Sequence, residues 1–118
     1  STFGGNPLAC SAGCAALSTI INDKLYENSA VMGDYFIGKL NDLKEKYSII
    51  KEVRGKGLMI GVELLQPKAV AVKMKCLEAG YLIGSVGENI IRMLPPLIIS
   101  KEDIDRFITA LDSIFEKL

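Results

Sequence analysis

The hydrophobic pattern changes its period partway along the chain, and this change restricts the possible folds more than any other feature. From Met32 to Tyr47, apolar side chains recur every three or four positions, which is the spacing of one helix face. In residues 57–65, apolar and other side chains alternate instead, which is the spacing of a strand. A chain of 118 residues has room for only one core. We therefore expect a single α+β domain.

Capping and turn residues predict the remaining elements. Asn6 and Pro7 start a helix that runs to Ile21, and Ser100 with Asp103 starts a final amphipathic helix in capping-box fashion. The other expected elements are a strand at 49–53, a helix opened by Pro67 and closed by a left-handed Gly80, strands at 81–86 and 89–94, and a turn at Gly87-Glu88. Together they predict a sheet of three or four mainly antiparallel strands, covered on one side by helices and preceded by a long helix.

Residues 1–22 carry no charge, which invites comparison with a membrane segment or a signal peptide. The stretch also contains Ser, Thr, Asn and several Gly, and no basic residue precedes its apolar part. We expect instead a helix buried on most sides within a larger protein. Because the sequence begins at Ser1 rather than Met, we also expect the chain to be a fragment.

Composition excludes several classes of function. The 14 basic and 14 acidic residues balance, so we expect neither nucleic acid nor a membrane as a partner. Histidine is absent, which excludes imidazole-based triads and most zinc sites within these residues. The three cysteines, Cys10, Cys14 and Cys76, have no CxxC spacing and predict a reducing, cytoplasmic setting in which they act as small buried hydrophobes.

The first seven residues combine two hydroxyls, two glycines and a helix N-terminus. Such donors and the positive end of a helix dipole can bind a phosphate. Ordinary capping with a flexible glycine turn explains the same residues, and no full phosphate-loop pattern is present. Both interpretations stay open on spacing alone.

Two basic positions need separate interpretations. In Arg54-Gly55-Lys56-Gly57 the order of residues is not that of a phosphate loop, so we expect a tight turn with a solvated lysine. Arg92 lies in a predicted strand among apolar neighbours, where a cation needs a carboxylate partner. That partner could be Glu63, in a structural salt bridge, or a ligand carboxylate held bidentately.

Three segments, taken in order, resemble the C-terminal part of the class III pyridoxal-phosphate aminotransferases. They are STFGGNPLAC at 1–10, VRGKGLMIGVEL at 53–64 and GENIIRMLPPL at 87–97. The resemblance covers essentially the whole chain. Within the class it is strongest to members that act on N2-acetylornithine, with ornithine, succinylornithine and 4-aminobutyrate enzymes as alternatives. It implies a lead-in loop and helix at 1–22, coming from a large domain, and a small C-terminal domain at 23–118.

The resemblance also implies roles for individual residues. Thr2 matches a residue that binds the phosphate of pyridoxal 5'-phosphate across the interface of a homodimer. Ser1 matches a position that contacts substrate, an amino acid or 2-oxoglutarate. Arg92 matches an arginine that interacts with a substrate carboxylate or with an active-site glutamate. The lysine that binds the cofactor covalently precedes the loop at 1–7 in this family, so we expect the 118 residues alone to be inactive. The alternatives are a self-sufficient α+β binding module and an aminotransferase-like domain recruited for protein contacts.

Overall fold

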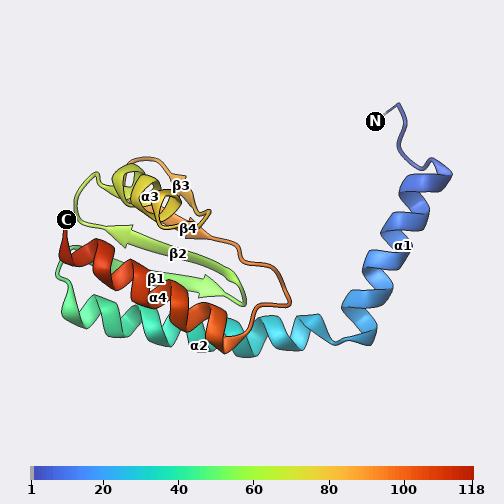
Figure 1. Cartoon of the computed structure of the whole chain (residues 1–118). Helices are drawn as coiled ribbons and strands as arrows, with labels where there is room; N and C mark the ends of the chain where they lie inside the picture. The colour runs from blue at the N-terminus through green and yellow to red at the C-terminus, as the bar shows by residue number, and fades with distance from the viewer. Residues whose placement is uncertain (1) are drawn as a thin grey trace.

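A computed structural model describes residues 2–118 and contains four helices and four strands within them (Figure 1). In chain order these are α1 (Pro7–Asn22), α2 (Leu25–Lys46), β1 (Ile50–Lys56), β2 (Met59–Leu64), α3 (Ala69–Glu78), β3 (Gly84–Val86), β4 (Ile90–Met93) and α4 (Lys101–Glu116). The predicted α+β class is confirmed.

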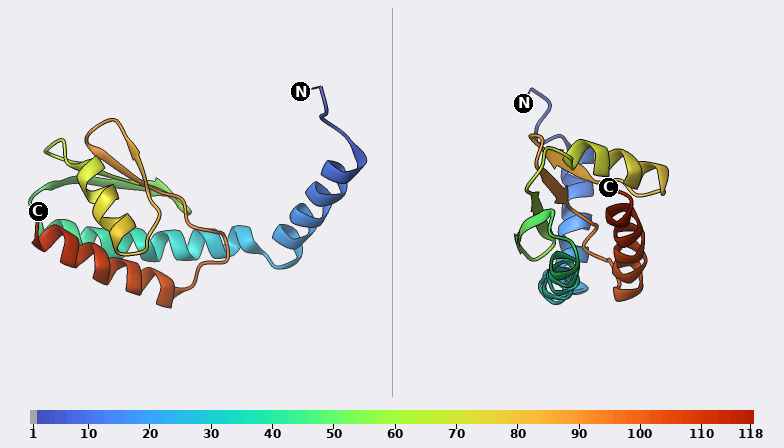
Figure 2. Two further views of the ribbon diagram at one scale, coloured as in Figure 1. Left: turned by 45° about the horizontal axis from the view of Figure 1, so that its top comes forward. Right: turned by 90° about the vertical axis from the view of Figure 1, so that its left-hand side faces the viewer.

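The strands form one antiparallel sheet in the order β1-β2-β4-β3. Helices α2, α3 and α4 cover one face of it, as Figure 2 shows in its right-hand view. The alternating pattern explains why, since one set of strand side chains is buried beneath the helices. The buried set is Ile60, Val62, Leu64, Ile91 and Met93. Within residues 2–118, no helix covers the other face of the sheet, which is called the open face below.

The helices bury the faces that their periodicity predicts. In α2 the buried apolar side chains are Met32, Phe36, Leu40 and Leu43; in α4 they are Ile104, Phe107, Leu111, Ile114 and Phe115. The predicted capping box is confirmed, because Ser100 Oγ accepts a hydrogen bond from the Asp103 amide and the Asp103 carboxylate accepts one from the Ser100 amide.

Helix α2 crosses the β1–β2 turn at very close range. A Cβ added to Gly33 would lie 2.3 Å from the carbonyl oxygen of Gly57. Gly57 itself has φ +54°, and the Leu58 amide donates a 3.3 Å hydrogen bond to Ser29 Oγ. These contacts fix how α2 lies across the sheet.

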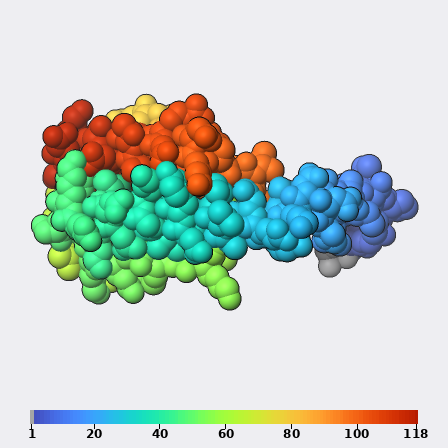
Figure 3. Space-filling view, turned by 90° about the horizontal axis from the view of Figure 1, so that it is seen from below, coloured from blue at the N-terminus to red at the C-terminus, as the bar shows by residue number. Residues whose placement is uncertain are grey.

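Helix α1 projects away from the rest of the molecule, and none of its residues is buried (Figure 3). Lys24, with φ 52°, turns the chain between α1 and α2. No other element of residues 2–118 covers α1, so its expected burial within a larger protein stays a prediction (Figure 1). In the described part of the chain, no helix has the length and apolar character needed to cross a membrane.

Several predicted boundaries need correction. Helix α3 begins at Ala69 rather than at Pro67, and β3 begins at Gly84 rather than at residue 81. Residues 54–56 continue β1, so the predicted tight turn lies at Gly57-Leu58, although Lys56 is exposed as expected. Gly80, with φ +86°, follows α3 as predicted.

Candidate functional site

The loop before α1 is capped by its own side chains. Asn6 Oδ1 accepts a 2.9 Å hydrogen bond from the Ala9 amide, and Asn6 Nδ2 donates one of 2.9 Å to the Phe3 carbonyl. Pro7 occupies the first helical position and has no N–H. The end of α1 therefore presents fewer donors than a bare helix N-terminus, and the capping interpretation explains Asn6.

A phosphate at this loop would have few ligands within the chain. Thr2 is exposed and carries a hydroxyl that can donate one hydrogen bond. Residues 2–6 include no basic side chain, so the remaining ligands of a dianion would have to come from elsewhere. These residues fit one contact to a phosphate rather than a complete site. Ser1, the other predicted residue of this loop, lies outside the described residues.

The open face of the sheet brings two arginines into one row. Arg54 on β1 pairs with Gly61 on β2, and Gly61 pairs in turn with Arg92 on β4. Directly opposed residues in an antiparallel sheet share a face, so both arginines lie on the uncovered side. Because Gly61 has no side chain, a depression of about 440 Å³ lies between them, with Met59 and Ile90 among its walls.

Arg92 is exposed and forms no ion pair within residues 2–118. Its candidate partner, Glu63, is bound elsewhere: Lys51 Nζ lies 2.5 Å from Glu63 Oε1, and Arg54 Nη1 lies 2.7 Å from Glu63 Oε2. Hydrogen bonds from Lys51 and Arg54 hold the pKa of the Glu63 carboxyl below its usual range. Of the two partners that the sequence left open for Arg92, Glu63 is therefore not the one found within residues 2–118. Sequence spacing did not indicate the Lys51–Arg54–Glu63 cluster, because its register includes a bulge at Lys51.

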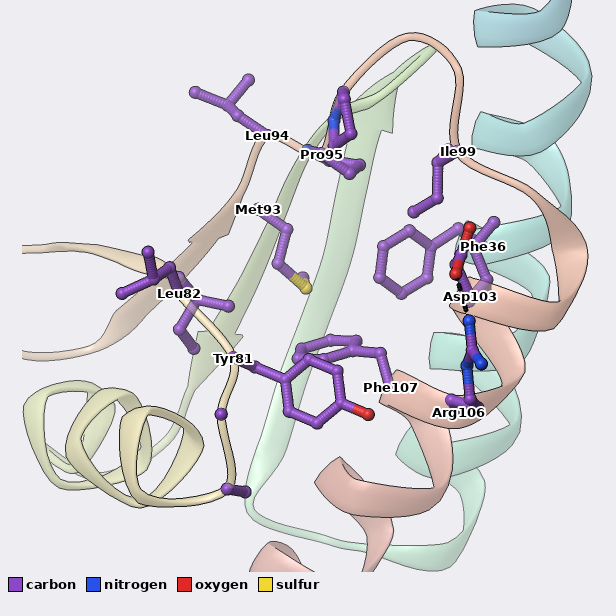
Figure 4. A pocket seen from close by; sticks show the side chains of 15 residues that line it. Phe36, Tyr81, Leu82, Met93, Leu94, Pro95, Ile99, Asp103, Arg106 and Phe107 are labelled. Carbon is purple, nitrogen blue, oxygen red and sulfur yellow. Dashed lines mark hydrogen bonds and ion pairs between the residues drawn. The ribbon is translucent and has the colours of Figure 1, made fainter.

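A second pocket, of about 530 Å³, lies between the end of β4, the α3–β3 connection and α4 (Figure 4). Phe36, Tyr81, Met93 and Phe107 give it mainly apolar walls. Its ion pair, Asp103 with Arg106, is internally neutral, and Asp103 already caps α4. No sequence motif indicated this pocket, whose edge includes Pro95 and Pro96.

The three cysteines differ in how exposed they are to solvent. Cys10 and Cys14 are exposed on α1 within the described chain, so their expected burial would require a larger protein, whereas Cys76 on α3 is buried in the core. Burial raises the pKa of the Cys76 thiol to about 11, which makes it a poor nucleophile. The described residues contain no cluster of three or more side chains suited to hold a metal ion.

Comparison with known proteins identifies aminotransferases at the level of both sequence and structure. The family model "Aminotransferase class-III" matches residues 1–115. The acetylornithine aminotransferase of Methanocaldococcus jannaschii is 52% identical over 99% of this chain and 29% of its own length. The ornithine aminotransferase of Macrococcus caseolyticus is 46% identical over 99% of this chain and 29% of its own length. A crystal structure of acetylornithine aminotransferase from Elizabethkingia anophelis superimposes with a TM-score of 0.94 at 34% identity, over 100% of this chain and 32% of that one.

Proposed function

The chain belongs to the class III aminotransferases, and from this premise we propose that it forms part of an enzyme that transfers the terminal amino group of N2-acetylornithine to 2-oxoglutarate. Relatives named acetylornithine aminotransferase support this substrate. The chain spans about 30% of their length, so the proposed activity belongs to a longer polypeptide or assembly. We place that enzyme in the cytoplasm and in arginine biosynthesis.

One observation carries the proposal: Arg92 lies beside a depression on the open face with no ion pair in the described chain. Both proposed substrates carry a carboxylate: in 2-oxoglutarate one is next to the carbon that gains nitrogen, and in N2-acetylornithine it lies at the other end of the chain from the terminal amino group. A guanidinium holds such a carboxylate through two parallel hydrogen bonds, which fix its orientation as well as its position. Arg92 would therefore hold 2-oxoglutarate by the carboxylate next to its reacting carbon, and could hold acetylornithine by the carboxylate remote from its reacting end.

We propose Thr2 as a ligand of the cofactor phosphate and Ser1 as a substrate contact. Class III aminotransferases use pyridoxal 5'-phosphate, which when bound withdraws electrons from the reacting carbon of the substrate. The exposed Thr2 hydroxyl can reach a phosphate held by another polypeptide, as in a homodimer whose active site lies at the subunit interface. Residues 1–22 would lead in from the cofactor-binding part, and residues 23–118 would form the small domain.

Ornithine is the second candidate substrate, because ornithine aminotransferases are 46% identical to this chain over 98–99% of it. Identity of this size does not separate the two amino acids, which differ only by the acetyl group on the α-amino nitrogen. Assays of both amino acids on one enzyme would show whether it recognises the acetyl group.

A hybrid enzyme tests the proposal. In it, residues 1–118 replace the matching segment of the Methanocaldococcus jannaschii acetylornithine aminotransferase. We expect the hybrid to bind cofactor and to transfer nitrogen from acetylornithine to 2-oxoglutarate, with a lower kcat/KM for ornithine. The unmodified relative is the control. A hybrid that folds and binds cofactor but turns over neither amino acid would contradict the proposed function, and preference for ornithine would correct the substrate.

A further inference from the structure

Glu63 lies within reach of Arg92 yet does not contact it. Across the β2–β4 ladder, Gly61 faces Arg92 and Glu63 faces Ile90, so Glu63 is the diagonal neighbour of Arg92 on the same face. Diagonal neighbours lie about 7–8 Å apart, a distance that two long side chains can bridge. An Arg92–Glu63 pair would occupy the guanidinium that the proposed function assigns to substrate.

Two cations on the opposite side hold Glu63 instead. Its two carboxylate oxygens are bound separately, Oε1 by Lys51 at 2.5 Å and Oε2 by Arg54 at 2.7 Å. Arg54 is in turn fixed by Glu52 at 2.6 Å. The Glu63 side chain is 22% exposed, against 45–55% for the other three, so it lies at the centre of the cluster.

The backbone contributes to this arrangement through the bulge in β1. The register shifts between Ile50, which faces Leu64, and Glu52, which faces Glu63, so Lys51 is an extra residue in the strand. A bulge redirects the side chains around it. It allows Lys51 to reach Glu63 alongside Arg54, which is two residues farther along the chain.

We propose that Lys51 and Arg54 are positioning residues that hold the Glu63 carboxylate on the β1 side of the open face and so keep Arg92 available to a ligand carboxylate. This inference rests on the proposed role of Arg92. The cluster of Lys51, Glu52, Arg54 and Glu63 has two positive and two negative charges, so it leaves Arg92 as the uncompensated charge of the depression. Without the two cations, Glu63 would pair with Arg92 and compete with the ligand.

NMR of arginine side chains can follow this competition directly, because the chain has three arginines, Arg54, Arg92 and Arg106. In the double variant K51Q/R54Q we expect the Arg92 Nε–Hε signal to shift as Glu63 ionises in the acidic range. In the wild-type chain we expect no such dependence on Glu63. The charged groups that face Glu63 are Lys51, Glu52 and Arg54 from β1 and Arg92 from β4. The Arg106 signal, from α4, reports that each variant is folded.

Two triple variants separate a direct Glu63 contact from a change in net charge. Adding E63Q to K51Q/R54Q should abolish the pH dependence of Arg92. Adding E52Q changes the charge equally but leaves Glu63 free, and should preserve that dependence. Equal behaviour of the two triple variants, or a double variant whose Arg92 signal ignores Glu63, would overturn the inference.

Acetate, titrated against chloride at equal ionic strength, supplies the binding readout. We expect K51Q/R54Q to weaken the acetate response of Arg92 about twofold to fivefold, which is the range of one exposed ion pair. Adding E63Q to K51Q/R54Q should restore the acetate response, and adding E52Q should not. Equal restoration by the two substitutions would overturn the inference. A wild-type Arg92 that ignores acetate would count against the proposed function, while the ligand-free pH readout still decides this inference.

Discussion

At the scale of single residues, the site depends on which polar groups are already satisfied within the chain. The Asn6 side chain caps α1, and the Glu63 carboxylate forms ion pairs with Lys51 and Arg54. Thr2 and Arg92, which are proposed to contact the cofactor and the substrate, are both exposed. Their proposed roles differ, so their variants should fail in different ways.

Replacing Thr2 by alanine should weaken cofactor binding. In the hybrid enzyme, Thr2→Ala removes one hydrogen bond to a charged group, which contributes about 1.5–3 kcal/mol. The cofactor dissociation constant, measured by equilibrium dialysis, should rise roughly tenfold to a hundredfold. Thr19→Ala is the matched control, because that hydroxyl bonds only within α1, to the Ala15 carbonyl. A Thr2 variant with the same constant as this control would contradict the assignment.

Asp103 should make stability depend on pH. Hydrogen bonds from Ser100 and then from Arg106 hold the pKa of the Asp103 carboxyl below its usual value. A carboxyl whose pKa is lower in the folded state stabilises the fold above its unfolded pKa of about 3.9 and loses that effect as pH falls. The Tm of wild type should exceed that of Asp103→Asn at pH 6, and the difference should disappear near pH 2. A difference that is constant across this range would contradict the prediction.

At the scale of elements, the crossing of α2 over the β1–β2 turn sets where the open face lies. Gly33→Ala should destabilise the fold, since its Cβ would meet the Gly57 backbone, and overpacking of this kind costs about 1–3 kcal/mol. Gly38→Ala in the same helix is the control, because a Cβ there meets nothing within 4 Å. It should be neutral or stabilise by up to about 1 kcal/mol. Urea unfolding measures both, and equal effects would refute the close crossing.

Periodicity predicted the elements that bury a continuous apolar face and was less accurate at their ends. It found the buried faces of α2 and α4 and the alternation of β2. It extended β3 too far because it counted Tyr81 as a strand residue. Tyr81 lies outside the sheet, and its ring packs against that of Phe107 with the ring centroids 5.2 Å apart. It could not decide between Glu63 and a ligand as the partner of Arg92, because strand register and bulges depend on pairing across the sheet, which spacing along one strand does not contain.

At the scale of the whole molecule, the chain has a packed body and a projecting arm. Its extents are 50 × 31 × 23 Å, and the N-terminus lies at the far end of the arm from the packed body (Figure 1). Helix α1 exposes Leu8, Leu17 and Ile21, each more than half accessible. In the proposed enzyme this surface would be covered by the remainder of the polypeptide or by its partner subunit.

Thiol labelling can test that covering. In the 118-residue chain, Cys10 and Cys14 should react rapidly with a disulfide reagent, and Cys76 only when the fold opens, because it is buried and its pKa is raised to about 11. In the hybrid enzyme we expect Cys10 and Cys14 to be protected as well. Equal reactivity of these two thiols in the chain and in the hybrid would show that α1 stays uncovered.

The catalytic part of the proposal is a separate statement about the whole molecule. None of the lysines in residues 1–118 precedes the loop at 1–7, where the family carries the residue that binds the cofactor covalently. We therefore propose that these residues alone do not transaminate. Turnover of acetylornithine by the purified 118-residue chain with added pyridoxal 5'-phosphate would refute this.

The most direct test of the account is Arg92→Lys in the hybrid enzyme, because it keeps the charge and removes the bidentate fork. We predict that the KM values for acetylornithine and 2-oxoglutarate rise roughly tenfold or more while the cofactor dissociation constant is unchanged. Arg106→Lys on α4, whose arginine pairs with Asp103, is the control. Unchanged KM values together with lost cofactor or a lowered Tm would show that Arg92 is a structural residue and would contradict the account.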